Sequence, residues 1–517
     1  MKICNPLRKL LLASCVTAGV LLTSVTPIYA AGGTFSNPSD APATGTIINS
    51  YASVNNIFNN TINLDSANGF SSGDTALLIQ MKGVLVNRSD SSSHGNITDY
   101  KSAGRFEFVD IATVAGNTVV LTKKPDVNFQ VSGVVQLIRI EKYTNKTVNG
   151  TISAAPWDGK KGGVVAIDDT GTLTLNGTID VSGLGFVGGQ LAQEKPFDFC
   201  SRDQSNFTGP MQRATGNKGE GIVVDTANHR ARKGHNANGG GGGNITDGGG
   251  GGGGNFGAGG LGGRELDICD FSSHHGGLGG QSLDYSPMNR LFMGGGGGSG
   301  SEVSQKAKGG ARTGGGIVII RAKKLVSNGG DILSKGLSAY NDDGNGADGG
   351  GAGGSIGLVI PNGITGNPEI EVAGGHGGDE FNGSYAHGTG GGGGGGTVIL
   401  NGPSCASVHW TAEGGSSGIS KLGAEVGDPK WGATDGETGG CLTNFINLPP
   451  VEPPNPPSPS MDIQACVAVT PLAALPDGLE DLSFPKGYWA TSYYEGTDGV
   501  ENAIYTTGNL NGQGASG

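Results

Sequence analysis

The sequence GGIVII at residues 315–320, continued by a GG turn at 329–330 and by DILSKG at 331–336, decides the fold of this chain. Both apolar runs are of strand length and rich in β-branched residues, and glycine stands at the turn between them. Helical periodicity is hard to find in this stretch or elsewhere after the first 30 residues. The stretch therefore predicts two short strands joined by a turn.

The same plan recurs in three other parts of the chain. GGVVAI at 162–167 leads to TIDVSG at 178–183, and GGSIGL at 353–358 leads to EIEVAG at 369–374. In these copies and in the first quoted, the closing glycine stands 20 residues after the second glycine of the leading pair, and an isoleucine stands 16 residues after it. A fourth copy, which begins with GGTVIL at 395–400, is two residues shorter.

Stacking of these copies would bury their apolar side chains. One copy cannot bury its own apolar residues, whereas copies laid on one another can, and this is the logic of a β-solenoid. The alternative is that any glycine-rich β-protein shows GG before apolar residues by chance, and the common spacing weakens it. We therefore predict a real repeat, with a long insertion at about 190–313 between the first and second copies.

Glycine makes up 102 of the 517 residues. Its unbroken runs lie at 239–243, 248–254, 294–298 and 390–396. Glycine-rich tracts can be flexible coils, or they can be extended helices of the polyproline-II type, which pack side by side when no side chain intervenes. We favour packed polyglycine-II segments, because Asn255 and Phe256 stand between runs as anchoring residues would.

The predicted fold class is all-β: an N-terminal β barrel or sandwich, followed by a glycine-rich β-solenoid-like repeat body with packed polyglycine segments. The N-terminal unit has ordinary composition and short β-rich runs punctuated by turn residues. Composition divides the chain into a signal peptide at 1–30, an N-terminal β domain at 44–150, a glycine-rich repeat domain at 151–447, a proline-rich linker at 448–460, and the start of a further C-terminal unit, consistent with truncation, at 461–517.

The N-terminus is typical of an exported protein. A basic segment with Lys2, Arg8 and Lys9 precedes an apolar stretch, and Ala30 offers a cleavage site. A lipobox match at 12–15 makes a lipoprotein the alternative. No later apolar stretch could span a bilayer, so we expect no transmembrane span after signal removal and a secreted or cell-surface location. The net charge of −12 argues against a nucleic-acid partner.

Export makes disulfides possible. Five cysteines remain after signal removal, and the simplest sequential pairs join Cys200 to Cys269 and Cys405 to Cys441. Cys466 is then left over, for pairing with another chain or with residues beyond this sequence. Connectivity cannot be deduced from one sequence, so this pairing is a hypothesis.

Calcium is the metal that the sequence favours, and no other cofactor is expected. Zinc on Cys200, Cys269, His274 and His275, with His229 and His235, is the alternative, but no pair has CxxC or HxxxH spacing and a Cys200–Cys269 disulfide competes with it. The stretch GGHGGDEFN at 374–382 partly fits the calcium nonapeptide, with Asp379 as an oxygen ligand and Phe381 pointing into the core. Asp348 and Asp343 lie in the related stretch NDDGNGAD at 341–348. A chance match or an Asx-rich surface turn is the favoured alternative.

The cluster HRARKGH at 229–235 is the one basic group in an acidic chain. Arg230, Arg232 and Lys233 could contact an anionic glycan or a lipopolysaccharide phosphate, and a solvated loop is the alternative. For catalysis, GGSIG at 353–357 spells GxSxG but lacks the strand before it and the helix after it that a nucleophile elbow requires. No catalytic residue is therefore assigned.

The GG-(Val/Ile) repeats around polyglycine resemble those of bacterial glycine-rich surface proteins, many of them adhesins or envelope proteins. The polyglycine tracts are also similar to the glycine-rich domain of the anaplastic lymphoma kinase receptor and to phage tail-tip adhesins, in which polyglycine-II helices pack into a lattice that displays loops. The signal peptide argues against a phage protein. The resemblance covers roughly 160–415 and implies an architecture, without assigning a binding residue.

We therefore predict a secreted or cell-surface structural or adhesion protein that presents loops on a glycine-rich β scaffold. Its partner would be a glycan or protein ligand of a cell envelope or a host surface. A polysaccharide-active β-helix enzyme, lyase or hydrolase, is the alternative. A disordered, elastic matrix component is a further one.

Overall fold

The computed structural model of the protein is nearly all β, with large sheets, and the chain forms two compact units, residues 1–453 and 454–517. The expected signal peptide and proline-rich linker lie outside the described residues. The structure describes residues 41–190, 206–211, 215–244, 247–264, 276–286, 289–301, 310–342, 345–381, 384–444, 491–495 and 501–506.

The N-terminal strands of the first unit form the antiparallel part of a 13-stranded sheet. Their alternate residues, such as Ala52, Leu78 and Leu137, are buried in one apolar cluster. The strands are β2 (Ser50–Phe58), β3 (Thr61–Leu64), β4 (Thr75–Gln80), β7 (Phe106–Ala115), β8 (Thr118–Leu121) and β9 (Val135–Tyr143). A separate short pair consists of β5 (Leu85–Val86) and β6 (Ile97–Asp99).

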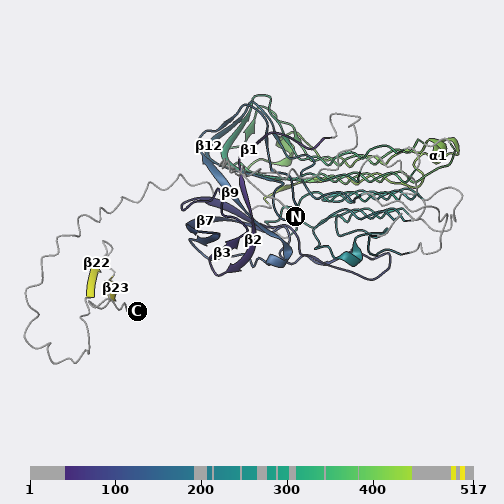
Figure 1. Ribbon diagram of the computed structural model, residues 1–517. Coiled ribbons are helices and arrows are strands. Elements are labelled where there is room, and N and C mark those ends of the chain that lie inside the picture. Colours follow the sequence, from purple (N-terminus) through teal and green to yellow (C-terminus); the bar gives the residue numbers. More distant parts are fainter. Residues whose placement is uncertain are drawn as a thin grey trace, which may run out of the picture. The chain divides into compact units, whose positions relative to one another are not determined.

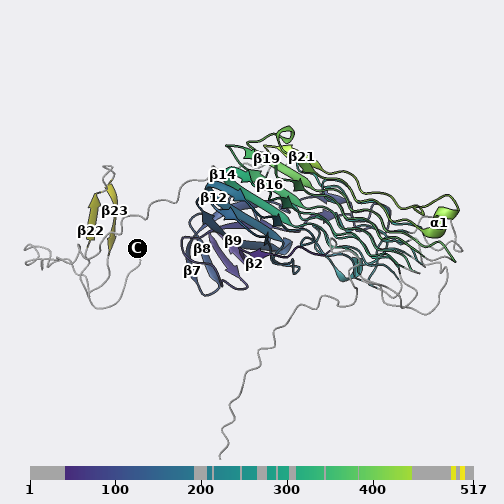
Figure 2. The same cartoon turned by 90° about the horizontal axis from the view of Figure 1, so that it is seen from above.

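The same sheet continues into the repeats, because β9 pairs in parallel with the first repeat strand. The expected boundary near residue 150 is therefore not a break in the sheet. The parallel strands that follow are β12 (Val164–Leu175), β14 (Ile317–Ser327), β16 (Ser355–Val359), β19 (Thr397–Asn401) and β21 (Gly440–Thr443), with β10 (Thr147–Val148) beside β12 and β17 (Ile364–Thr365) beside β14. Figure 2 shows β12 to β21 side by side.

A second sheet of six short parallel strands lies against the first. Its strands are β1 (Thr46–Ile47), β11 (Ile152–Ser153), β13 (Ile179–Asp180), β15 (Ile332–Leu333), β18 (Ile370–Glu371) and β20 (Trp410–Thr411). The isoleucine that recurs in the repeat is the paired residue, since Ile179, Ile332, Ile370 and Trp410 lie in one row.

The pairing register confirms the alignment of the copies. In the long sheet Val164 pairs with Ile317, Ile317 with Ser355, and Ser355 with Thr397, which are the residues directly after the second glycine of each copy. Alternate residues of these strands point to opposite faces. One set, including Val318 and Ile320, is buried between the two sheets, and the other set packs against the insertion.

The glycine-rich segments run side by side from the strands toward the short helix α1 (Lys421–Glu425), as both views show (Figures 1 and 2). The run at 248–254 lies in their interior. Its N–H groups donate to three neighbouring segments in turn, with N···O distances of 2.7–3.0 Å. Gly250 and Gly253 donate to the segment at 347–350, Gly251 and Gly254 to that at 238–241, and Gly249 and Gly252 to that at 260–263.

The carbonyl groups of the same run accept from three further segments. The donors are Gly277 and Gly280, Gly295, Gly298 and Ser301, and Gly391 and Gly394. The run therefore has six hydrogen-bonded neighbours, and every third residue faces the same one. A Cβ atom on Gly252 would lie less than 3.0 Å from the backbone of Gly392, so only glycine allows this approach. We call the set of segments hydrogen-bonded in this way the glycine lattice.

Other elements are few. Short 3-10 turns lie at Val131–Gly133, Ala227–His229 and Cys405–Ser407. The second unit contributes an antiparallel pair, β22 (Thr491–Glu495) and β23 (Glu501–Thr506). Among the residues that the structure describes, no helix is long and apolar enough to cross a membrane.

Candidate binding surface at the end of the glycine lattice

Three lattice segments end together beside α1. Isolated parallel bridges join Asp342 to Glu380 and Glu380 to Ser420. Ser420 is the N-cap of α1, since its Oγ accepts a hydrogen bond from the Gly423 N–H at 3.2 Å and donates one to Glu380 Oε2 at 3.1 Å. The helix therefore begins where the lattice ends, and a buried carboxylate links the two.

Exposed apolar side chains gather in the loops at this end. Phe381 and Tyr385 lie in the loop after Glu380 and are 44% and 45% exposed. Ile419 and Val426 flank α1 and are 49% and 65% exposed. The segments of Phe381 and Ile419 lie side by side, since the Glu380 N–H donates to the Ile419 carbonyl at 2.9 Å. Grouped apolar exposure marks interaction sites in soluble proteins, so we take these four residues as the candidate binding surface.

Contacts behind the surface hold the loops in place. Arg264 forms an ion pair with Asp428 and lies over the ring of Trp431, 4.8 Å from its centre. The Thr389 hydroxyl donates to the Lys430 carbonyl at 2.6 Å. Arg264 and Thr389 thus tie the loop around α1 to two lattice segments. Neither residue belongs to the exposed set.

Ionisable groups are buried beneath the loops. His387 Nδ1 lies 3.0 Å from Asp247 Oδ2. Burial lowers the pKa of His387, but the hydrogen bond and charge of Asp247 raise it overall, while burial raises the pKa of Asp247. Burial also raises the pKa of Asp348 to about 7. These groups pair inside the protein, and none belongs to the exposed surface.

The residues of the calcium hypothesis are partners of backbone groups. Asp348 Oδ1 accepts from the Gly300 N–H at 2.9 Å, and Asp379 Oδ1 accepts from the Ile419 N–H at 2.9 Å. Asp343 lies outside the described residues. Within the part of the chain that is described, no group of three His, Cys, Asp or Glu residues could hold a metal ion. Phe381, expected in the core under that hypothesis, is exposed instead.

The basic cluster does not form one exposed patch. Arg230 is exposed, whereas Arg232 and Lys233 are 8% and 6% exposed. Lys233 Nζ lies 4.6 Å from the ring centre of Phe207, and the Lys233 carbonyl accepts from the Leu278 N–H. Two of the three side chains are therefore built into the protein, because the cluster passes between lattice segments.

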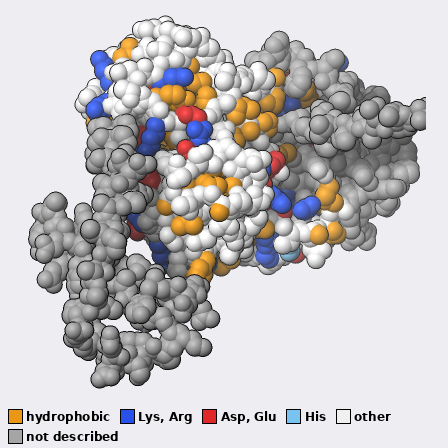
Figure 3. Space-filling model, turned by 60° about the vertical axis from the view of Figure 1, so that its left-hand side comes forward, with side chains coloured by type: hydrophobic (Ala, Val, Ile, Leu, Met, Phe, Trp, Pro, Cys, Tyr) orange, Lys and Arg blue, Asp and Glu red, His pale blue; other side chains and the backbone are white. Residues whose placement is uncertain are grey.

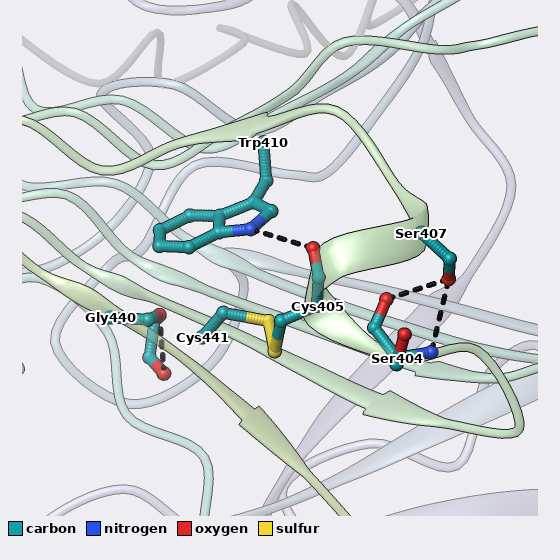
Figure 4. Close-up of a disulfide and its surroundings, with 7 residues drawn as sticks. Ser404, Cys405, Ser407, Trp410, Gly440 and Cys441 are labelled. Carbon is teal, nitrogen blue, oxygen red and sulfur yellow. Dashed lines mark hydrogen bonds between the residues drawn. A yellow bond between two sulfur atoms is a disulfide. The ribbon is translucent and has the colours of Figure 1, made fainter.

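Cys405 and Cys441 form a disulfide, as the sequential pairing predicted, with their Cα atoms 6.0 Å apart. It links the turn after β19 to β21, the last strand of the long sheet, and the Trp410 indole N–H donates to the Cys405 carbonyl nearby at 3.1 Å (Figure 4). The proposed partners Cys200 and Cys269 lie outside the described residues.

The serine of the GxSxG match has a structural role. Ser355 is fully buried in β16, and its hydroxyl donates to the Phe292 carbonyl at 2.6 Å and lies 2.9 Å from the Tyr285 hydroxyl. Ser355 belongs to a repeat strand, as the alignment predicted, and its contacts with Tyr285 and Phe292 join that strand to the insertion.

The strand-bearing side of the first unit shows a different surface. Its hydrophobic side chains lie in several groups separated by charged and other side chains (Figure 3). Phe58 at the end of β2 is the most exposed large apolar residue described, at 69%, and Leu85 is 52% exposed. Scattered exposure of this kind is common in soluble proteins and does not mark a site.

Comparison with known proteins identifies no family. No protein-family model matches the chain, and no curated protein matches it. One solved structure, the Gp54 tailspike of Acinetobacter baumannii bacteriophage AP22 in complex with A. baumannii capsular saccharide, aligns with 10% sequence identity and a TM-score of 0.13. The alignment covers 78% of this chain and 61% of the tailspike chain. At that TM-score the similarity carries no argument about fold or function.

Tyr385, Ile419 and Val426 were not singled out in the sequence, and Phe381 was singled out only as a core residue of the calcium hypothesis. A signal for them exists: Phe381 and Tyr385 in FNGSYAH, and Ile419 and Val426 in GISKLGAEV, are large apolar residues inside polar, glycine-containing loops. Because no strand or helix period surrounds these residues, no pattern assigns them to a buried face.

Proposed function

We propose that this chain is an exported adhesion protein in which a stiff glycine-rich body presents binding loops at the end where α1 lies. The exposure of Phe381, Tyr385, Ile419 and Val426 in loops held from behind is the observation that carries the proposal. Aromatic rings provide flat apolar contact at low entropic cost, and tyrosine adds a hydroxyl for hydrogen bonding. The signal sequence at 1–30 supports export.

We infer that the body combines a β-solenoid-like stack with a polyglycine-II lattice. The parallel rows of paired strands support the first part. The three-residue period of donors along 248–254 supports the second, because a helix of the polyproline-II type has three residues per turn. A body with so many backbone hydrogen bonds resists bending, which suits the presentation of loops on a surface.

The ligand that fits these loops best is a surface glycan. The chain carries a net charge of −12, which disfavours strongly acidic partners. Aromatic and aliphatic side chains beside polar loop groups suit the mixed apolar and hydroxyl-bearing faces of a neutral or weakly charged saccharide. A protein ligand of a cell envelope or host surface is the remaining partner class.

A binding comparison between two variants tests this function. Phe381→Ser combined with Tyr385→Ser should reduce binding to a glycan array and to whole bacterial and host cells at least tenfold, without changing the circular dichroism spectrum. Phe58→Ser, equally apolar and more exposed but at the end of β2, is the matched control and should bind like the unchanged protein. Equal binding by both variants would refute the site, and release of oligosaccharides from any array member would favour an enzyme.

A further inference from the structure

A lysine and two carboxylates lie close together, largely shielded from solvent, where the N-terminal strands contact the insertion. Lys82 follows β4, and its side chain is 5% exposed. Its Nζ lies 2.6 Å from Glu220 Oε1 and 3.9 Å from Asp225 Oδ2. The ring centre of Phe186 lies 5.4 Å from the same nitrogen. An amine and a carboxylate are thus held in contact beside an aromatic ring.

Both sides of this contact are fixed. The backbone N–H of Gly83 donates to the Ile222 carbonyl at 2.7 Å, which ties the chain after Lys82 to the chain after Glu220. The Asn236 side-chain amide donates to Asp225 Oδ1. The other carboxylate oxygen, Oδ2, is the one nearer Lys82. The three side chains therefore have little freedom to separate.

The second oxygen of Glu220 lies between two N–H donors. Oε2 accepts from the Val187 backbone N–H at 2.9 Å and from the Trp157 indole N–H at 3.0 Å, and the same indole N–H also lies 3.1 Å from Oε1. Two donors at this distance form the arrangement that stabilises negative charge on the oxygen of a tetrahedral intermediate. Oε1 meets the lysine and shares the indole N–H, whereas the Val187 N–H serves Oε2 alone.

We propose that Lys82 and Glu220 condense into an intramolecular isopeptide bond. One proton of the Lys82 ammonium passes directly to Glu220 Oε1, and the neutral amine then attacks Cδ. Negative charge develops on Oε2, where Val187 and Trp157 hold it. A second proton leaves the nitrogen, is relayed by Asp225 to Oε1, and the C–Oε1 bond breaks. One C–N bond forms and one water molecule departs, so no oxidant, reductant or cofactor is required.

Burial favours this product. Two charges withdrawn from water cost free energy that their attraction only partly returns, whereas an amide is neutral. Proximity supplies much of the remaining barrier reduction, because the reacting atoms are already in contact. Exposed pairs lack these features: Lys430 Nζ lies 2.7 Å from Asp435, but both side chains are about half exposed. The bond would tie the N-terminal strands covalently to the insertion.

Peptide mapping of the full-length secreted protein tests the bond. After reduction and tryptic digestion, we expect a cross-linked species that joins the peptides containing Lys82 and Glu220, lighter by one water molecule than their sum, with cleavage after Lys82 absent. The Lys430 and Asp435 peptides are the internal control and should stay linear. Full recovery of a linear peptide ending at Lys82 from folded protein would overturn the proposal.

Asp225→Asn separates chemistry from packing. The asparagine can still accept the Asn236 hydrogen bond but cannot relay a proton, so the folded variant should show at least a tenfold lower cross-linked fraction. Its circular dichroism spectrum should match that of the unchanged protein. A fully cross-linked Asp225→Asn protein would overturn the role assigned to Asp225, and a cross-link mapped to residue 225 in the unchanged protein would overturn the assignment of Glu220.

Discussion

The stacked strands and the glycine lattice are made by the same chain segments in succession, yet they are stabilised in different ways. The segment that begins with β15 places Ile332 between two sheets, where its side chain fills the core. Four residues later, Gly336 lies in the lattice, where a Cβ atom would lie less than 3.0 Å from the Gly351 backbone. The stack depends on side-chain volume, and the lattice depends on having none.

The two regions therefore tolerate different substitutions. A side-chain core can be refilled by a residue of similar size, because neighbouring side chains adjust. A lattice of backbones has no side chains to adjust, so an added methyl group must move a chain and its hydrogen bonds. The cost of ordering glycine is offset there by hydrogen bonds to as many as six neighbours.

The largest effect is expected from a side chain placed inside the lattice. Gly252→Val would force the Gly392 segment away and disturb the bond from the Gly252 N–H to the Gly260 carbonyl. We expect a loss of more than about 3 kcal/mol in the free energy of unfolding, at or above the usual range for overpacking. Urea denaturation measures it.

Gly150→Ala is the control for that change, because a Cβ atom at Gly150 meets nothing within 4 Å. It should be neutral or slightly stabilising. Equal stability of the Gly252→Val and Gly150→Ala proteins would show that the lattice backbone is free to move, contrary to the comparison.

Loss of the Cys405–Cys441 disulfide should be the next largest effect. The bond closes a separation of 36 residues at the last strand of the stack. Disulfides typically stabilise a fold by about 2–4 kcal/mol. The double variant Cys405→Ser with Cys441→Ser should lower the urea midpoint accordingly. If strand and lattice signals then unfold at different urea concentrations, the two regions are less coupled than their shared segments imply.

A conservative change in the stack should cost little. Ile332→Val removes one methylene from the core, for a loss of about 1 kcal/mol. Gly336→Ala adds one methyl group to the same segment and should cost more, since the added carbon meets backbone. Thermal unfolding of the two variants compares side-chain and backbone packing directly, and the reverse order would contradict the account.

The smallest expected effect is a loss of folding stability as the pH falls. Burial, with the charge of Lys218, lowers the pKa of His235 to about 4. The unfolded chain, with an ordinary histidine pKa of about 6.5, then binds a proton that the folded protein does not, so stability falls as pH drops below about 6.5. Between about pH 7 and about pH 6 the loss should be about 0.7 kcal/mol. His235→Asn should reduce this slope in urea titrations, and an unchanged slope would show that His235 does not contribute.

The repeat register was predictable because the identity and spacing of particular residues determine it. Glycine pairs and an isoleucine at constant spacing placed Ile317 beside Val164 and Ile332 beside Ile179, as the structure has them. The strands β11 and β1, which extend the six-stranded sheet, were missed, since no glycine pair directly precedes them at the repeat spacing. Pairing of β9 with β12 was missed as well, because sequence composition changes near residue 150 although the sheet does not end there.

The lattice neighbours were not predictable in the same way. Glycine carries no side chain that could identify its partner, so nothing in the run at 248–254 indicates that 391–394 lies beside it. Anchors carry some of this information: Asn255, singled out between runs, is fully buried and donates to the Gly353 carbonyl at 2.7 Å. Tyr385, Ile419 and Val426 were missed because their loops follow no strand or helix period, and Phe381 was wrongly placed in the core by a partial motif match.

Amide hydrogen exchange of the full-length protein tests most directly the claim that glycine here is a packed structural material. We expect amides at 250–253 and 391–394 to be as strongly protected as those of β14, because each is hydrogen-bonded inside the lattice. Complete exchange of these glycine amides within seconds, while β14 stays protected, would contradict it.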